Sequence, residues 1–382
     1  MKRLCLACLT LLAACGDNKK ALSPDGGGGG DAPVDAPPTP HAIIVAPSLN
    51  FGPPPGIMSE LDVAAQRVTQ NLFAGVVGDD PYLRAYNGML YVVNRSDGNN
   101  VTIIDASTLQ YVNQIATGAS SNPQDVAVVG DKLYVPALGT AGVVVLSQSA
   151  GTMTSTIDLS GSNAANDPDG KPDCVSAFAV GTDVYVACDV YNETTFVPAP
   201  HGMLVVIDST TDTVRTAVQL PAPNPQGELV QLPDMDLMIA AEPLDTGSDE
   251  MTGCIVRVTP GTTPSAVCQI ENVAINGIVN HMALKPAPNP LLWISVEAFD
   301  FSGASLSTWN VLDASDLTNN ISPSTETITD VAVCPDNTII AADQNATLNG
   351  LRIYNGTTEV TTMPLPIGLP PGDGNGMVCY DR

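Results

Sequence analysis

Short runs of β-branched and other apolar residues recur along most of the chain. Residues 89–93 and 101–104 form two such runs, and residues 133–135 and 143–146 form two more. Clusters of Gly, Asn, Asp, Pro and Ser, which favour turns, separate the runs. No long stretch keeps the helical apolar period of 3.6 residues. The pattern therefore predicts an all-β protein.

The apolar runs follow one another in an order that repeats. Residues 123–159 are interpreted as an inner strand, a turn at Gly130 and Asp131, a second strand, a loop, a third strand and an outer fourth strand. The spacing of roughly 43–53 residues between units is that of the four-stranded blades of a β-propeller. Similar units begin at residues 82, 173, 227, 280 and 329.

Two segments are left over, and they complement each other. Residues 42–75 have the pattern of the second, third and fourth strands of a blade, and residues 376–380 that of a lone first strand. Pairing them closes the ring as a one-plus-three "velcro" blade and leaves no free sheet edge. The sequence thus predicts a β-propeller of seven four-stranded blades over residues 41–382. Six or eight blades remain alternatives, because the fifth unit is irregular.

The unit that begins at residue 82 also resembles a known repeat. Its segment GMLYVVNRSDGNNVTIIDASTLQYVNQI, residues 88–115, is similar to the YVTN family of β-propeller repeats. In that family a Tyr-Val-x-Asn strand precedes a strand that ends in Ile-Asp. Weaker copies are KLYVPALGTAGVVVLS and GMLVVIDSTTDTVRTAV. The resemblance covers roughly residues 80–380 and implies a propeller, but this fold hosts binding proteins and enzymes alike.

Residues 1–14 have the pattern of a signal peptide. A short basic stretch precedes an apolar run at residues 4–14 that is too short to span a bilayer. The run ends in LAAC at residues 12–15, which resembles a bacterial lipobox. The resemblance implies a lipoprotein in which the thiolate of Cys15 receives the lipid. The alternative is an ordinary signal peptide with an incidental cysteine.

Residues 15–40 are expected to form the lipidated cysteine and a disordered tether, because they are rich in Gly, Pro and Asp. The residue after Cys15 is Gly16, whereas inner-membrane lipoproteins usually carry aspartate there, so we expect an outer-membrane anchor. Without residues 1–14 the chain keeps 12 basic and all 40 acidic residues, which gives a formal charge of −28. Such a surface repels nucleic acid.

Six cysteines follow Cys15, and an even number in an exported protein favours disulfides. The strand register predicts three pairs. Two of them are symmetric about predicted turns, and the third would lock the closing blade. Reduced structural thiols are the alternative. The predicted pairs are Cys174 with Cys188, Cys254 with Cys268, and Cys334 with Cys379.

Aligning the blades places one polar residue near the start of each innermost strand. Since these strands line the central channel, the polar residues should form a ring near one mouth. Oxygen ligands from Asp125, Glu228, Asp330 and Asn375, with a nitrogen from His281, would suit Ca²⁺ or Mg²⁺. The alternative is a set of polar groups that cap strands or bind channel water. The full ring is Tyr82, Asp125, Ser176, Glu228, His281, Asp330 and Asn375.

Residues 167–173, DPDGKPD, resemble a short calcium loop. Asp167, Asp169 and Asp173 would supply the carboxylates around the turn at Gly170, although Lys171 stands where another oxygen ligand is wanted. A plain acidic turn is the alternative. Calcium is the cofactor that would suit both this loop and the ring.

No motif for covalent haem, zinc proteolysis, a serine nucleophile elbow or a phosphate-binding loop occurs in the sequence. The leading hypothesis is therefore a membrane-anchored binding or scaffold module that takes a protein or a small molecule at the propeller face. The competing hypothesis is a metal-assisted, lactonase-like hydrolase that uses the funnel carboxylates and His281. A structural spacer at the cell surface is a third possibility.

Overall fold

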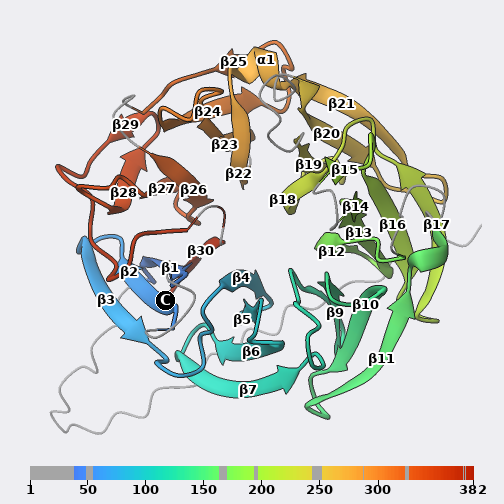
Figure 1. Cartoon of the computed structure of the whole chain (residues 1–382). Coiled ribbons are helices and arrows are strands. Elements are labelled where there is room, and N and C mark those ends of the chain that lie inside the picture. Colours follow the sequence, from blue (N-terminus) through green and yellow to red (C-terminus); the bar gives the residue numbers. More distant parts are fainter. Residues whose placement is uncertain are drawn as a thin grey trace, which may run out of the picture. The chain divides into compact units, whose positions relative to one another are not determined.

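Seven four-stranded antiparallel sheets are arranged as the blades of a ring in the computed structural model (Figure 1). The structure describes residues 38–48, 55–162, 170–192, 197–242, 252–286, 288–322, 327–372, 374 and 376–382. All of them belong to one unit, Pro38–Arg382. The predicted all-β fold and its seven blades are confirmed. None of the helices in these ranges is long and apolar enough to cross a membrane.

Within blades 1 to 6 the strands run from the channel outward in chain order. Blade 1 consists of β4 (Pro81–Tyr86), β5 (Met89–Asn94), β6 (Asn100–Asp105) and β7 (Gln110–Ala116). Blade 2 consists of β8 (Ala127–Val129), β9 (Lys132–Ala137), β10 (Gly142–Ser147) and β11 (Thr152–Asp158). Blade 3 consists of β12 (Cys174–Val180), β13 (Asp183–Cys188), β16 (Met203–Asp208) and β17 (Thr213–Gln219), with a side hairpin of β14 (Tyr191–Asn192) and β15 (Val197–Pro198).

The next three blades repeat this order, and a short helix follows blade 4. Blade 4 consists of β18 (Pro225–Gln231), β19 (Leu237–Ala241), β20 (Cys254–Thr259) and β21 (Ser265–Glu271), and α1 spans Asn272–Ile275. Blade 5 consists of β22 (Ile278–Lys285), β23 (Leu291–Glu297), β24 (Ala304–Asn310) and β25 (Leu317–Thr318). Blade 6 consists of β26 (Ile328–Val333), β27 (Thr338–Asp343), β28 (Gly350–Asn355) and β29 (Thr358–Glu359).

Blade 7 closes the ring from both ends of this unit. The C-terminal strand β30 (Met377–Asp381) pairs with β1 (Pro40–Ala46), which continues into β2 (Ile57–Asp62) and β3 (Arg67–Leu72). Ile43 lies opposite Val378 in this antiparallel pair. The predicted one-plus-three blade is therefore present, and β1 and β30 cover the edge that each would otherwise leave unpaired.

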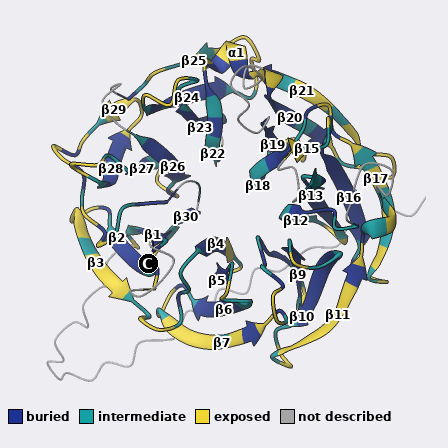
Figure 2. Ribbon diagram, in the orientation of Figure 1, coloured by how far each residue is buried: buried dark blue, intermediate teal, exposed yellow. Residues whose placement is uncertain are grey.

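The apolar core lies between neighbouring blades. The inner and middle strands carry runs of buried residues, whereas outer strands such as β7 and β11 are largely exposed (Figure 2). Between blades 2 and 3, for example, Tyr134 and Val145 belong to the same buried cluster as Val186 and Val205. A sheet buried on both faces explains why the inner strands are continuous apolar runs rather than alternating ones.

Three disulfides connect the pairs of cysteines that the register predicts. Cys174 lies opposite Cys188 in the first two strands of blade 3. Cys254 and Cys268 join the outer two strands of blade 4. Cys334 lies one residue beyond β26 rather than within it, and its bond to Cys379 attaches the closing strand to blade 6.

Candidate functional site

The innermost strands all start at the same face of the ring, which we call the entry face. In blade 1, Tyr82 near the start of β4 pairs with Val93 near the end of β5, so the loop after β5 returns to this face. The same holds for the loops after β9 and β13, because each second strand is antiparallel to the first. The entry face therefore combines the starts of inner strands with the loops that follow second strands.

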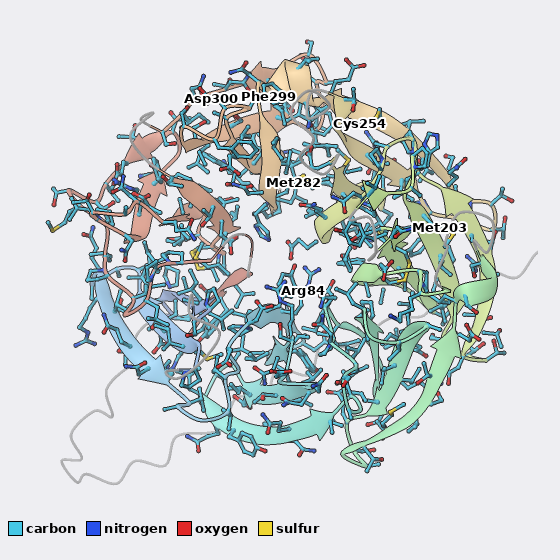
Figure 3. All side chains as sticks on the ribbon, in the orientation of Figure 1. Arg84, Met203, Cys254, Met282, Phe299 and Asp300 are labelled. Atoms are coloured by element: carbon cyan, nitrogen blue, oxygen red, sulfur yellow. A yellow bond between two sulfur atoms is a disulfide. The ribbon has the colours of Figure 1, made fainter. Side chains whose placement is uncertain are left out.

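Arg84 lies in the central channel, two residues inside the predicted ring (Figure 3). Its guanidinium donates two hydrogen bonds of 2.7 Å to the two carboxylate oxygens of Asp125 and a third to Glu228. Burial opposes the positive charge, but the adjacent Asp125 carboxylate raises the pKa of Arg84 above its ordinary value. The channel thus holds an arginine between carboxylates that come from blades 2 and 4.

Asp125 also ties three blades together through neutral donors. Its Oδ2 accepts hydrogen bonds from the hydroxyl of Ser176 at 3.2 Å and from the backbone N–H of Ala177 at 2.8 Å. The hydroxyl oxygen of Ser176 in turn accepts the N–H of Leu229 at 3.1 Å. Asp125 is fully buried. Asp125 therefore connects blade 2 to blade 3 directly and to blade 4 through Ser176.

Arg84 contacts two residues of the predicted cation site. Asp125 and Glu228 have it as their counter-charge, and Asn375 lies outside the described residues, so the cation site stays a prediction. Across the part of the chain that the structure describes, no three His, Cys, Asp or Glu side chains are grouped as metal ligands. The alignment considered only the first polar position of each inner strand, which is Tyr82 in β4, and so missed Arg84. Because side chains alternate between the two sides of a strand, Arg84 lies on the same side as Tyr82.

His281 of β22 and Asp330 of β26 form a second buried pair. The imidazole Nδ1 lies 2.7 Å from Asp330 Oδ1 and 3.2 Å from the carbonyl oxygen of Val331. The other nitrogen, Nε2, has no hydrogen-bond partner and lies 3.9 Å from Glu228 Oε2. A carboxylate at one nitrogen and an open second nitrogen is the arrangement of a histidine that can accept a proton.

The remaining predicted site residues lie away from this pair or outside the described part of the chain. Asp173 is buried just before β12 and accepts the backbone N–H of Tyr191 at 2.9 Å. Cys15, Asp167, Asp169 and Asn375 lie outside the described residues, so lipidation and the calcium loop stay predictions.

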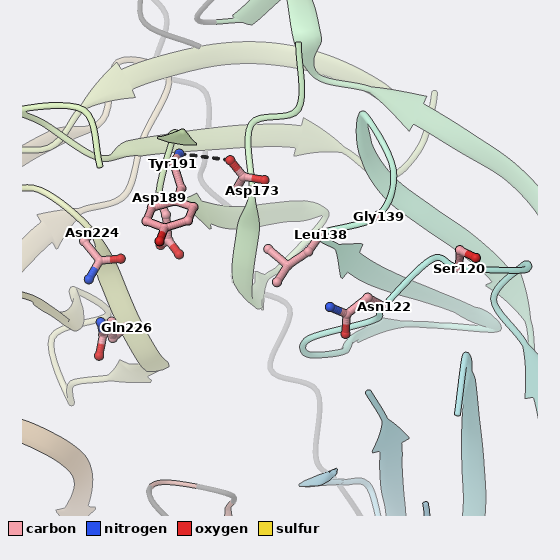
Figure 4. A pocket seen from close by; sticks show the side chains of 9 residues that line it. All are labelled: Ser120, Asn122, Leu138, Gly139, Asp173, Asp189, Tyr191, Asn224 and Gln226. Carbon is pink, nitrogen blue, oxygen red and sulfur yellow. Dashed lines mark hydrogen bonds between the residues drawn. The ribbon is translucent and has the colours of Figure 1, made fainter. Parts of the chain in front are cut away.

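Two connected cavities open on the entry face. The mouth cavity, about 330 Å³, lies over the channel and is lined by Tyr82, Arg95 and Gln124, among others. The side cavity, about 570 Å³, lies over blades 2 to 4 and is lined by Asn122, Asp173, Tyr191 and Asn224, among others (Figure 4). Three residues line both cavities, so we treat them as one entry-face groove. The shared residues are Leu138, Asp189 and Gln226.

Several buried polar atoms along this groove have no hydrogen-bond partner in the described structure. They are the hydroxyl of Tyr82 and Arg95 Nε in the mouth cavity, Asn224 Nδ2 in the side cavity, and Asp189 Oδ1 where the two meet. Leaving such a group unsatisfied costs about 1–3 kcal/mol, so buried polar atoms normally have partners. Four residues of the groove thus hold buried polar atoms whose hydrogen-bonding capacity is unmet in the described structure.

Asp189 is a strongly perturbed acid of the groove. It follows Cys188 at the end of β13, and its backbone N–H donates to the carbonyl of Asp173 at 2.9 Å. Burial raises its pKa well above the ordinary value, and the carboxylate of Asp173 raises it further. A strongly perturbed acid inside a cavity is a typical feature of functional sites. No sequence motif marked Asp189.

No protein-family model matches the chain, and no curated protein matches it in sequence. Solved structures do match. The periplasmic gluconolactonase PpgL of Pseudomonas aeruginosa is 16% identical, with a TM-score of 0.60 over 88% of this chain and 98% of its own. A putative 6-phosphogluconolactonase of Bacteroides fragilis is 12% identical, with a TM-score of 0.58 over 90% and 98%. Apo AztD of Citrobacter koseri is 12% identical, with a TM-score of 0.52 over the same shares. At such identities the likeness shows the fold alone, and the chain is a seven-bladed β-propeller.

Proposed function

We propose that this protein is an envelope-anchored binding module whose propeller holds a small polar ligand in the entry-face groove. The observation that carries the proposal is the concentration of unpartnered buried polar atoms around two joined cavities. The side-chain amides of Asn122, Gln124, Asn224 and Gln226 add donors and acceptors to the same lining. A few convergent polar groups in a concave site are the usual basis of ligand specificity.

The contacts within the channel also favour binding over hydrolysis through a metal ion. Asp125 is saturated by Arg84, Ser176 and Ala177, and Glu228 also accepts from Arg84. Carboxylate oxygens that already accept hydrogen bonds from the protein have less capacity left to bind a metal ion. The channel carboxylates therefore support the ring, whereas the groove above them offers free hydrogen-bonding capacity.

A ligand screen on the full-length chain in detergent tests this proposal. The unfolding temperature is measured with neutral sugars, amino acids, aliphatic amines and small carboxylates. We expect one class to raise it by several degrees, since a ligand at 100 times its Kd stabilises the folded state by about 2.7 kcal/mol. The same ligand should lose most of its effect on Gln226→Leu and keep it on Gln110→Leu, which changes an exposed outer-strand residue.

Two outcomes would overturn the binding proposal. One is a screen in which every class leaves the unfolding temperature unchanged. The other is a ligand whose effect is the same on the wild-type chain and on Gln226→Leu, because such a ligand binds outside the groove.

A lactonase-like hydrolase, the metal-assisted alternative raised by the sequence, is the second candidate, and the His281–Asp330 pair favours it. His281 Nε2 could take a proton from water as the water oxygen bonds to a lactone carbonyl carbon, and return it to the ring oxygen as the ring C–O bond breaks, which gives the hydroxy acid. Asp330 would stabilise the imidazolium between the two transfers. Two of the structurally similar propellers carry gluconolactonase names. Hydrolysis of glucono-δ-lactone in a pH-stat, with and without Ca²⁺, tests this candidate. Turnover that disappears in His281→Gln would favour it over the binding module.

A further inference from the structure

Asp189 and Asp173 are held side by side by the fold of blade 3. Asp173 precedes Cys174 and Asp189 follows Cys188, and these two cysteines form a disulfide between paired strands. The backbone N–H of Asp189 donates to the carbonyl of Asp173, and the N–H of Val190 donates to the carbonyl of Pro172 at 3.2 Å. The two carboxylates are thus fixed at the wall of the side cavity by covalent and backbone contacts.

The described lining of the side cavity contains two aspartates. Its other described residues are Ser120, Asn122, Leu138, Gly139, Tyr191, Asn224 and Gln226, and none of them is a Lys, Arg or His. One oxygen of Asp173 accepts the N–H of Tyr191. Asp189 Oδ1, by contrast, is buried without any donor. Carboxylates or phosphates would be repelled here, and a positively charged donor would be attracted.

We propose that the side cavity binds ligands that carry a primary ammonium group, with Asp189 as its acceptor. This inference rests on the proposed binding function and names the chemical class of the ligand. An ammonium group supplies three donors from one point charge. One of them can reach Asp189 Oδ1 while the others meet the polar side chains around it. The cavity of about 570 Å³ is large enough for a small aliphatic or amino-sugar amine.

An organic cation fits the lining better than a metal ion does. Calcium takes six to eight oxygen ligands at 2.3–2.6 Å. The two aspartates are the only acidic residues of this cavity in the described chain, and they are not grouped with a third acidic, His or Cys side chain as metal ligands. Leu138 and the ring of Tyr191 supply apolar surface for the carbon chain of an amine, and an aromatic ring also attracts ammonium groups.

Proton release from Asp189 on amine binding can be measured on the wild-type protein. Burial and the carboxylate of Asp173 raise the pKa of Asp189. An ammonium group beside it favours the anion, so amine binding should release a proton to the buffer. Titration calorimetry in HEPES and in phosphate, which differ in their heats of ionisation, measures this release.

The experiment compares 1,5-diaminopentane with pentane-1,5-diol and CaCl₂ as probes of the full chain, by titration calorimetry. We expect the diamine to bind with proton release and the diol to bind at least tenfold more weakly. Asp189→Asn should weaken the diamine at least tenfold. The control Asp381→Asn removes an exposed carboxylate from the end of β30 and should leave binding unchanged.

The other outcomes overturn the inference in distinguishable ways. If the diol binds as well as the diamine and only Gln226→Leu weakens it, the groove binds ligands but does not select amines, so the proposed function survives. If Ca²⁺ binds and Asp189→Asn abolishes that binding, the site is a metal site. If no probe binds and no proton is released by the wild-type chain, the amine inference is wrong whether or not Asp189→Asn folds.

Discussion

Arg84 of β4 and Asp125, which lies just before β8, are joined by a bidentate ion pair inside the central channel, with both N–O distances at 2.7 Å. The guanidinium and the carboxylate are both almost completely shielded from solvent. Asp125 then reaches blade 3 through Ser176 and Ala177, and Arg84 reaches blade 4 through Glu228. The ion pairs of Arg84 thus connect blades 1, 2 and 4 across the channel.

Replacing Arg84 by methionine should destabilise the propeller strongly. Removing one partner of a buried pair leaves the other charge uncompensated, which costs about 3–5 kcal/mol. Urea unfolding followed by circular dichroism measures the loss. The matched control is Arg215→Met, whose pair with Asp183 is much more exposed and should cost no more than about 1 kcal/mol. Equal costs for the two variants would show that the channel pair does not brace the ring.

Much of the fold was predictable from the sequence, because blades are local units. Residues 89–93 and 101–104 were identified as strands, and they fall within β5 and β6. Between β4 and β5 the turn residues Asn87 and Gly88 both have positive φ, 49° and 76°, which is the geometry that Asn-Gly favours in tight hairpins. Closure was also predictable, since the leftover segments 42–75 and 376–380 lacked complementary strands.

The candidate site was much less predictable, because it depends on contacts between blades. The sequence placed Asp125 and Glu228 near one mouth but gave no sign that Arg84 would lie between them. Asp189 follows a strand directly and resembles any acidic loop residue. The pKa of Asp189 is raised by burial and by the carboxylate of Asp173 just before the other disulfide-linked strand. Strand patterns specify which residues face inward, but not which side chains finally pair across a channel.

Removing the Cys334–Cys379 disulfide should cost more stability than removing Cys254–Cys268. The first bond closes a loop with a sequence separation of 45 and the second one with a separation of 14. The loop-entropy relation gives about 4 and about 3 kcal/mol for such loops. Urea unfolding of the two double Cys→Ala variants measures the difference.

The two disulfide variants should also differ in where they open first. Only Cys334–Cys379 attaches the closing strand β30, so its loss should expose the C-terminal residues to carboxypeptidase under native conditions. The Cys254–Cys268 variant serves as the control and should keep its C-terminus protected. Equal trimming of both variants would mean that pairing with β1 alone holds β30 in place.

Stability should fall as the pH rises from about 4.5 to 8 through the titration of Glu242. Its carboxylate accepts hydrogen bonds from Asn272 and Val279, but burial outweighs them and raises its pKa to about 8. Because the folded-state pKa lies above the ordinary value, the folded chain binds the extra proton. The associated stability is fully present below pH 4.5 and is lost as the pH approaches 8, by up to about 1.4 kcal/mol per pH unit.

Glu242→Gln isolates this titration. The amide keeps the size of the side chain without its charge, so the variant should show a flatter dependence of unfolding free energy on pH than the wild type. Asp189 also has a raised pKa but is present in both proteins, so it cancels in the comparison. Urea unfolding at pH 5, 6.5 and 8 measures the two slopes, and parallel curves would contradict the assignment to Glu242.

The lipid anchor proposed for Cys15 makes a prediction about where the full chain resides. Several acyl chains hold a protein stably in a membrane, since each buried methylene contributes about 0.8 kcal/mol. In a Gram-negative host the wild-type chain should fractionate with the outer membrane and incorporate labelled palmitate, whereas Cys15→Ala should lose both properties. Cys15→Ala that still incorporates palmitate would exclude Cys15 as the acceptor. A labelled wild-type chain in the inner-membrane fraction would leave lipidation intact but contradict the sorting expected from Gly16, the residue that follows Cys15.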